Sequence, residues 1–218
     1  MKATDIVVWL ADSKNADSET IYKLYGHLFE EKRRNAIKWI KNEGERKNRI
    51  CTGFLLLKVL EEYDLCPDDI RYFENGKPYI FGRDDLFFNL SHSKGRIMLA
   101  LSGQEIGCDI QKYVEYRESL VKRICSEMEI SKPGFDVREK LNRVWAIKES
   151  YTKLTGTGIS VDLKDISFDI SNDNITVYEH DLPAAFGKTV IDEEDYYGVV
   201  VGKNPFENAL ISYFSFKF

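Results

Sequence analysis

The chain has 218 residues, of which 43% are hydrophobic and 13% aromatic, and a formal net charge of -5. This composition supports a sizeable core and excludes an intrinsically disordered chain, while the length allows one large domain or two small halves. The acidic balance argues against nucleic-acid binding by the protein as a whole. Because no apolar run approaches the ~20 residues that span a bilayer, we also expect no membrane partner.

The cysteines and the first residues bear on the cellular compartment. Four cysteines are widely spaced without a Cys-x-x-Cys pair, which favours reduced thiols over a disulfide framework or a zinc site. The first 14 residues contain only a five-residue apolar run and no small-residue cleavage site, unlike a signal peptide. We therefore expect a cytoplasmic protein.

The first half of the chain is predicted to begin with a buried strand and to continue with helices. Residues 6–10 are an apolar run typical of such a strand. Asp17 or Ser18 can cap a helix that extends to about Leu28. A longer helix is predicted over residues 46–63, with three residues pointing inward: Phe54, Leu57 and Leu60.

Basic residues are concentrated between residues 32 and 58. This segment contains nine basic and two acidic residues, which gives it a local charge of +7. Two interpretations remain open. The segment is the solvated basic face of a helix, or it is a patch for a phosphate-rich ligand or an acidic protein partner. The basic residues are Lys32, Arg33, Arg34, Lys38, Lys41, Arg46, Lys47, Arg49 and Lys58.

Short strands are predicted in the middle of the chain. The Asn75-Gly76 step lies between aromatic and β-branched runs and indicates a hairpin, and Pro78 confines its second strand to a sheet edge. Residues 87–93 then lead through a Lys94-Gly95 turn into a strand at residues 97–101.

The second half is predicted to begin with a strand at residue 106. Ile106, Cys108 and Ile110 share one face of this strand, and the other face carries Gly107, Asp109 and Gln111. Helices at about residues 117–126 and 138–154 follow, and then the predicted strands 166–170, 175–178, 196–201 and 210–216.

Each half thus runs from a strand through helices to antiparallel strands, which predicts the α+β class. The order suggests two similar halves, residues 1–104 and 105–218, although no sequence repeat is visible and no linker separates them.

The helix predicted over residues 138–154 has a clear apolar face and ends at the glycines that follow Leu154. Glu149 and Lys153 lie one turn apart on its opposite side. Taken alone, these two residues are a common exposed Glu–Lys pair. The apolar face consists of Leu141, Val144, Ile147, Tyr151 and Leu154.

Asp109 changes the interpretation of that helix. The carboxylate lies beside Gly107, which leaves room for a ligand, and would be costly to bury without a partner. If Glu149 projects toward Asp109, the two carboxylates form the kind of site that holds Mg²⁺ together with phosphate oxygens. Lys153 could then neutralise a transferring phosphoryl group, with Lys148 a weaker candidate. The alternative for Asp109 is a turn or salt-bridge role.

Two further side chains could contact phosphate. His92 lies between two serines and before a turn, so it is either a phosphate ligand or a hydrogen-bonded structural histidine. Lys77 could be presented at the hairpin end, or it could belong to a plain turn. The sequence contains no P-loop, dinucleotide fingerprint, nucleophile elbow or zinc spacing.

Four stretches in order resemble the 4'-phosphopantetheinyl transferase superfamily, specifically its monomeric surfactin-type branch. The last of them, the Trp-x-x-Lys-Glu-Ser-x-x-Lys string with an upstream Gly-x-Asp, is the most specific. The stretches are Gly76-Lys77-Pro78, Phe88-Asn89-Leu90-Ser91-His92-Ser93, Ile106-Gly107-Cys108-Asp109-Ile110 and Trp145-Ala146-Ile147-Lys148-Glu149-Ser150-Tyr151-Thr152-Lys153.

The resemblance implies a pseudo-dimeric α+β fold with two similar lobes and an active site in the cleft between them. It further implies Mg²⁺-dependent transfer of the phosphopantetheine arm of coenzyme A to a serine of an apo acyl or peptidyl carrier protein. Adenosine 3',5'-bisphosphate is the other product. A monomer is expected, because one chain supplies both lobes.

Positions that match the family motifs acquire implied roles. Asp109 and Glu149 would ligate Mg²⁺, and Glu149 or a metal-bound water would help deprotonate the carrier serine. The coenzyme A phosphates would be bound by Lys153, His92 and Ser91. Lys77 and Pro78 would line the adenine and ribose-phosphate pocket, Arg49 matches a family arginine before that pocket, and the cluster from Lys32 to Lys38 corresponds to basic residues near the 3'-phosphate.

Gln111 departs from the pattern, because many relatives have an acid two residues after the motif aspartate. An amide oxygen can ligate Mg²⁺ or hold its water, but it brings no charge and cannot act as a base. The basic role therefore moves to Glu149 or to water.

Two rival functions stay open: Mg²⁺-dependent hydrolysis of a nucleotide, and a degenerate relative that binds coenzyme A or a carrier protein without turnover.

Overall fold

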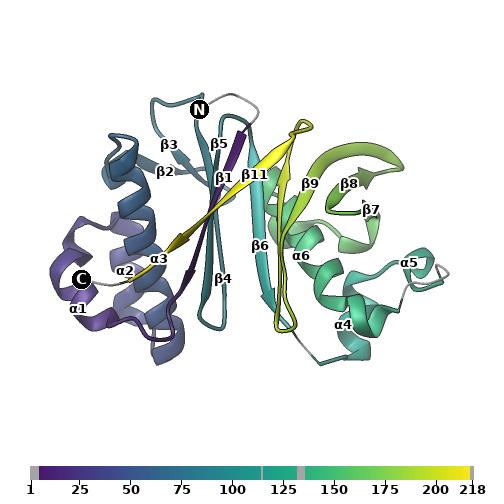
Figure 1. Ribbon diagram of the computed structural model, residues 1–218, viewed down its shortest axis with the longest axis horizontal. Helices are drawn as coiled ribbons and strands as arrows, with labels where there is room; N and C mark the ends of the chain where they lie inside the picture. Colours follow the sequence, from purple (N-terminus) through teal and green to yellow (C-terminus); the bar gives the residue numbers. More distant parts are fainter. Residues whose placement is uncertain (1–4, 114, 132–135, 217–218) are drawn as a thin grey trace.

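The computed structural model describes residues 5–113, 115–131 and 136–216. Strands and helices alternate in blocks, which confirms the α+β class (Figure 1). No helix in these three ranges is both long enough and apolar enough to cross a membrane.

The elements up to residue 102 supply three strands of a four-stranded sheet, together with helices and a small hairpin. The long helix α3 starts at an Asn42 cap whose side chain accepts a hydrogen bond from the Glu45 N–H. In chain order the elements are β1 (Asp5–Asp12), α1 (Ser18–Tyr25), a 3₁₀ turn (Gly26–Leu28), α2 (Glu31–Trp39), α3 (Glu43–Glu62), a 3₁₀ turn (Pro67–Asp69), β2 (Ile70–Tyr72), β3 (Pro78–Ile80), β4 (Phe87–Ser93) and β5 (Arg96–Ser102).

The remaining elements build a five-stranded sheet and return one strand to the first sheet. In chain order they are β6 (Ile106–Lys112), α4 (Glu118–Ile124), α5 (Glu127–Ser131), α6 (Val137–Thr155), two 3₁₀ turns (Gly158–Ser160 and Leu163–Asp165), β7 (Ile166–Ser171), β8 (Asn174–Glu179), β9 (Leu182–Asp192), β10 (Tyr196–Gly202) and β11 (Asn208–Phe214).

The two larger sheets have the strand orders β11-β1-β5-β4 and β6-β10-β9-β8-β7. The hairpin β4–β5 turns at Lys94 and Gly95, which both have positive φ, as a tight two-residue turn requires. β11 pairs in parallel with β1, so the end of the chain joins the first sheet. The division at residue 104 stays a prediction, and this strand pairing crosses it.

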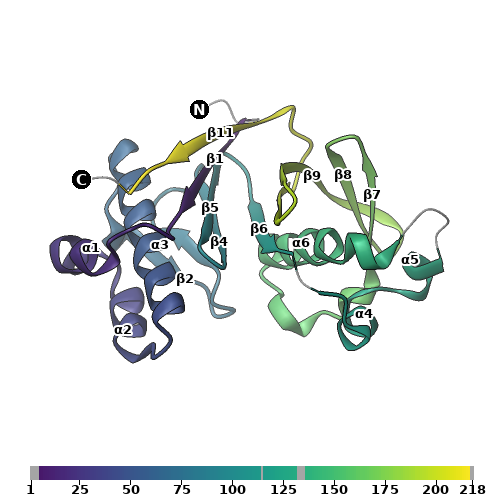
Figure 2. The ribbon, with the colours of Figure 1, turned by 60° about the horizontal axis from the view of Figure 1, so that its bottom comes forward.

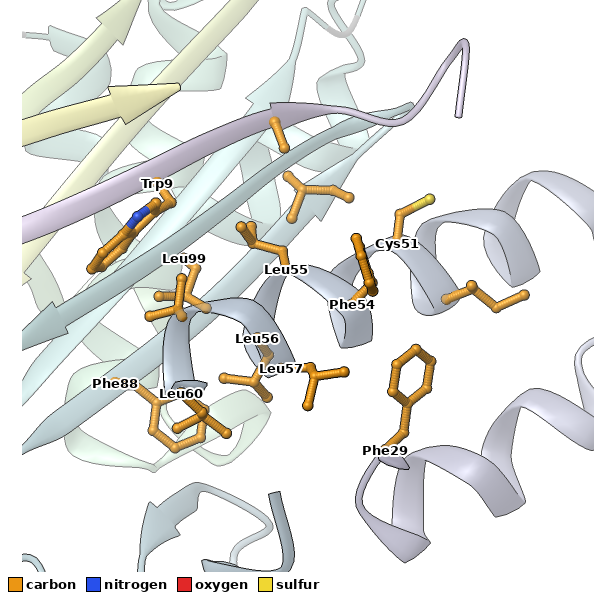
Figure 3. Close-up of a cluster of buried hydrophobic side chains, with 14 of the residues drawn as sticks. Trp9, Phe29, Cys51, Phe54, Leu55, Leu56, Leu57, Leu60, Phe88 and Leu99 are labelled. Atoms are coloured by element: carbon orange, nitrogen blue, oxygen red, sulfur yellow. The ribbon is translucent and has the colours of Figure 1, made fainter. Parts of the chain in front are cut away.

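The first core cluster lies between the first sheet and helices α1 to α3 (Figure 3). Phe54, Leu57 and Leu60 are buried, as predicted, but Leu55 and Leu56 on other sides of α3 are buried as well. The helix is therefore covered on several sides. Burial of each leucine contributes about 1.5–3 kcal/mol to the free energy of folding, relative to an exposed leucine.

A second cluster joins the two sheets face to face. Ile6 and Met98 of the first sheet pack here with Cys108, Ile110 and Val200 of the second. Figures 1 and 2 show the resulting order of layers, with α1, α2 and α3 outside one sheet and α6 outside the other.

Helix α6 packs on the second sheet with the five apolar residues predicted for its inner face, all of which are buried. Its closest approach is at Gly107, where a Cβ would lie 2.0 Å from the Ser150 carbonyl oxygen. The expectation that Gly107 leaves room for a ligand is therefore wrong, because the backbone of α6 fills that space.

Strand β9 is missing from the sequence-based prediction. It lies inside the sheet between β8 and β10 although it contains Pro183 and Gly187, two residue types that argue against an interior strand. Gly187 is required there because a Cβ would lie 2.8 Å from the Val200 carbonyl oxygen.

Candidate active site

A cavity of about 440 Å³ lies among helices α2, α3 and α6, the β2–β3 turn and strand β4. Eight of the charged, histidine and proline residues singled out in the sequence line it, although they come from segments more than a hundred positions apart. These residues are Lys32, Arg33, Arg49, Lys77, Pro78, His92, Glu149 and Lys153.

Asp109 lies next to this cavity and is 2% exposed. Its Oδ1 accepts hydrogen bonds from Ser91 Oγ and from Lys153 Nζ, both at 2.6 Å, and its Oδ2 accepts one from Gln111 Nε2 at 2.6 Å. A buried carboxylate needs such partners, since an unpaired charge in the interior is strongly destabilising. The structure thus brings three of the predicted residues, Ser91, Gln111 and Lys153, into direct contact with Asp109.

Lys153 connects the carboxylate to the cavity. Its ammonium also contacts Ser91 Oγ at 3.1 Å and the Cys108 carbonyl oxygen at 3.2 Å. Burial by itself would lower the pKa of Lys153, but the attraction of Asp109, together with Cys108 and Glu149, outweighs burial and raises it. Lys153 is therefore a permanent cation at neutral pH.

Glu149 lies one helical turn before Lys153 and faces the same cavity. Burial, and then the negative charge of Asp109, raise the pKa of this carboxyl, while Lys153 and Arg123 oppose the shift. Its carboxylate accepts no hydrogen bond from any residue in the described part of the chain. The acid is thus half-buried, close to a second acid and free to bind a proton or a cation.

These residues fit a magnesium ion. Asp109 and Glu149 offer two carboxylates, and Gln111 offers an amide oxygen, which are hard ligands of the type Mg²⁺ prefers. Within the described ranges no three His, Cys, Asp or Glu side chains cluster as a metal site. Asp109 and Glu149 therefore supply two charges, and Gln111 can add only a neutral ligand.

His92 projects from β4 with Nε2 at 3.8 Å from Glu45 Oε1. Burial lowers the pKa of His92, and Arg49, Lys153 and Arg33 lower it further against the opposing charge of Glu45. The imidazole is therefore neutral at pH 7 and offers one donor and one acceptor.

Lys77 does not present a free ammonium at the hairpin end. Its Nζ donates to the carbonyl oxygen of Leu154 at the C-terminus of α6, and burial lowers its pKa. The turn packs onto Gly156, which has a φ of +74° and where a Cβ would lie 2.3 Å from Asn75 Nδ2. The β2–β3 turn and the end of α6 are thus locked together beside the cavity.

Only part of the basic segment reaches the cavity. Lys32, Arg33 and Arg49 line it, whereas Arg46 pairs with Glu19 and Lys58 with Glu61 on the surface. The segment is thus divided between surface ion pairs and the lining of the cavity, and its role as a ligand patch stays a prediction.

Two cavity residues, Glu30 and Tyr72, were missed in the sequence. Glu30 Oε1 accepts hydrogen bonds from Arg33 Nε at 2.7 Å and from the Tyr72 hydroxyl at 3.2 Å. The ammonium of Lys32 lies 3.7 Å from the centre of the Tyr72 ring. Burial and Glu30 raise the pKa of Tyr72 to about 12, so its hydroxyl keeps its proton. Residues 42 positions apart carry no local signal that they meet.

Lys148 lies away from the cavity and is fully buried. Its ammonium donates to Glu129 Oε2 at 2.7 Å and to the Ile124 carbonyl oxygen at 2.8 Å. It ties α5 to α6 and takes no part in the cavity.

The comparisons with known proteins identify a family. The family model of the 4'-phosphopantetheinyl transferase superfamily matches residues 105–200. A 4'-phosphopantetheinyl transferase of Bacillus subtilis is 29% identical over 185 residues, which cover 80% of this chain and 82% of the relative. The transferase ffp of Bacillus subtilis is 30% identical over 172 residues, or 74% of this chain and 76% of the relative.

The transferase Sfp of Bacillus subtilis (strain 168) is 32% identical over 137 residues, which cover 59% of this chain and 61% of the relative. The family match, these relatives and the motif residues gathered around one cavity lead to one conclusion. The chain belongs to the 4'-phosphopantetheinyl transferase superfamily, in its surfactin-type branch, and is an enzyme of that class.

Proposed function

We propose that this enzyme transfers the 4'-phosphopantetheine arm of coenzyme A to a serine of an apo acyl or peptidyl carrier protein, with Mg²⁺ as cofactor. The observation that carries the proposal is the group Asp109, Lys153 and Glu149, which meets at the edge of a cavity lined with cations. In this reaction the serine oxygen bonds to the phosphorus next to the pantetheine. The bond from that phosphorus to the adenosine bisphosphate breaks, and the serine proton goes to a base.

Positioning and charge neutralisation are the main demands of phosphoryl transfer. Lys32, Arg33 and Arg49 line one end of the cavity and suit the phosphates of the nucleotide. Pro78 and the carbon chain of Lys77 suit a flat apolar base. Lys153 and the neutral imidazole of His92 can donate hydrogen bonds to the diphosphate.

Glu149 is the best candidate for the general base. Its pKa is raised, which makes its carboxylate a stronger base than that of a solvated glutamate. Asp109 is already engaged by three donors and serves better as a fixed anion. A magnesium ion held by Asp109, Glu149 and the Gln111 amide oxygen would supply neutralisation of the diphosphate charge.

The carrier is proposed to be acidic, because three residues of the basic segment line the cavity while the whole chain is acidic. A local basic surface would steer such a partner without attracting acidic proteins to the rest of the molecule. Carriers of fatty-acid, polyketide and nonribosomal-peptide synthesis are all compatible with this chemistry.

Intact-mass spectrometry tests the proposal. Apo fatty-acid and peptidyl carriers are incubated with the enzyme, coenzyme A and Mg²⁺, with and without EDTA. A gain of one phosphopantetheine that EDTA prevents is the expected result. Tight coenzyme A binding without a mass change would favour a degenerate binding protein, and consumption of coenzyme A without a carrier would favour hydrolysis.

A further inference from the structure

Strands β4 and β6 are edge strands of different sheets that lie beside each other without main-chain pairing. The far edge of β6 is paired with β10, so the near edge points its N–H groups toward β4. N–H groups on a buried edge must find acceptors, since a buried unsatisfied donor is costly.

Side chains of β4 supply these acceptors at every second residue. Asn89 Oδ1 accepts from the N–H of Cys108 at 3.1 Å, Ser91 Oγ from Ile110 at 3.3 Å, and Ser93 Oγ from Lys112 at 3.0 Å. The spacing of two on both strands matches the alternation of side chains along a β-strand. The result is a hydrogen-bond ladder of three rungs.

A ladder made of side chains separates two strands by more than the ~4.8 Å of main-chain pairing. The sheets therefore stay distinct, and the Lys153 ammonium reaches the Cys108 carbonyl oxygen and Asp109 at this junction. At this junction Asn and Ser side chains thus take the place of main-chain pairing.

The middle rung links the ladder to the chemistry. Ser91 Oγ accepts from the Ile110 N–H and donates to Asp109 Oδ1, so one hydroxyl holds both the strand and the carboxylate. The outer rungs fix how far β6 can slide along β4. β4 carries His92, and β6 carries Asp109 and Gln111.

We propose that Asn89 and Ser93 are positioning residues of the transferase, which set the place of Asp109 and Gln111 relative to Ser91 and His92. The inference rests on the proposed Mg²⁺-dependent transfer. The nucleotide end of the cavity is built from α2, α3 and the β2–β3 turn, and Ser93, unlike Asn89, does not line the cavity. Loss of the Ser93 rung therefore affects the metal site and kcat more than the KM for coenzyme A.

Ser93 is the rung to test, because it is only partly buried and does not line the cavity. Ser93→Ala removes the acceptor of the Lys112 N–H, and Ser93→Thr keeps a hydroxyl there. Ser102→Ala is the matched control: the fully buried Ser102 also accepts from a main-chain N–H, that of Gln104 at 3.2 Å, at the end of β5 and outside the ladder.

Three quantities are measured for each variant: kcat and KM in the carrier assay, Mn²⁺ affinity by electron paramagnetic resonance with coenzyme A present, and the midpoint of thermal unfolding. For Ser93→Ala we expect kcat and Mn²⁺ affinity to fall about tenfold, as for outer-shell partners of metal ligands. The KM for coenzyme A should stay near the wild-type value. Ser93→Thr should restore both quantities, and Ser102→Ala should change neither.

Wild-type kcat and Mn²⁺ affinity in Ser93→Ala would overturn the positioning role, as would equal losses in Ser102→Ala. Failure of the wild-type enzyme to modify any carrier would instead overturn the proposed function. The two failures are therefore distinguishable.

Discussion

Asp109 and Glu149 are held in different ways, and the difference decides how each responds to substitution. Asp109 accepts from three side chains, so its removal leaves the partly buried ammonium of Lys153 without its main partner. The Glu149 carboxylate accepts from no side chain that the structure describes, so its replacement leaves no donor unpaired. Glu149 is therefore the cleaner position at which to separate catalysis from stability.

We expect Glu149→Gln to lower kcat about a hundredfold or more, as loss of a positioned base usually does. The folded-state pKa of Glu149 lies above its unfolded value, so the stability it contributes is lost as pH rises through the folded pKa. In the metal-free protein Glu149→Gln should therefore unfold at an equal or higher temperature at pH 8, and this advantage should vanish near pH 4. Calorimetry at both pH values measures these unfolding temperatures. A variant less stable than the wild type at pH 8 would contradict the raised pKa of Glu149.

Gln111→Glu tests the charge of the metal site. A third carboxylate beside Asp109 and Glu149 should strengthen Mg²⁺ binding, while the hydrogen bond from Gln111 Nε2 to Asp109 Oδ2 is lost. The variant should therefore be less stable without metal and gain more stability from it than the wild type. Thermal unfolding against Mg²⁺ concentration measures both effects. Equal metal-induced shifts in the two proteins would show that residue 111 lies outside the metal's reach.

Helix α6 and strand β6 form one unit, because the first carries Glu149 and Lys153 and the second carries Asp109. Their spacing depends on Gly107, which allows the helix backbone to approach the strand. The other anchor is the C-terminus of α6, where Lys77 and Asn75 of the β2–β3 turn contact Leu154 and Gly156. The distance between the two carboxylates is thus decided by the close contacts at Gly107 and at the C-terminus of α6.

Gly107→Ala should push α6 from β6, since the new Cβ would meet main-chain atoms that cannot rotate away. We expect a stability loss of about 1–3 kcal/mol, as for other overpacked interiors, together with a marked fall in kcat. Urea unfolding and the carrier assay measure these effects. Gly44→Ala in the first turn of α3 is the control, because its nearest neighbour lies at an ordinary 3.4 Å. A fully active Gly107→Ala enzyme would contradict the role of this contact.

At the scale of the whole molecule, the two sheets share a core and a strand. Ile6, Met98, Cys108 and Val200 pack in one cluster between them, and β11 joins the first sheet after the second is complete. Phe214 of β11 also packs against Phe54 of α3, with ring centres 6.1 Å apart. Neither sheet can lose its structure without exposing part of the other's core.

We therefore expect the protein to unfold in a single cooperative transition. Trp9 reports on the first sheet and Trp145 on α6. Two variants, one that keeps only Trp9 and one that keeps only Trp145 of the three tryptophans, therefore report on each side separately. Within each variant, fluorescence and circular dichroism should give the same urea midpoint. Separate midpoints in either variant would show that the halves unfold independently.

Periodicity in the sequence was enough for the class, the order of most elements and the faces of β6 and α6. It was enough because alternation along a strand and helical spacing are properties of neighbouring residues. The motif positions also indicated which side chains belong to one site. Local pattern failed at β9, where Pro183 pairs with β8 but lies outside the stretch that pairs with β10, and Gly187 lies where β10 approaches closely.

The remaining features depend on residues far apart in the chain, so only the tertiary structure could decide them. It decides which cations of the basic segment line the cavity, and that the Lys77 ammonium donates a hydrogen bond to the Leu154 carbonyl oxygen. It also decides that Gly107 serves helix packing, and that the Asn89, Ser91 and Ser93 side chains replace main-chain pairing between two sheets. Each is a contact whose geometry is set by packing between elements, which no local pattern encodes.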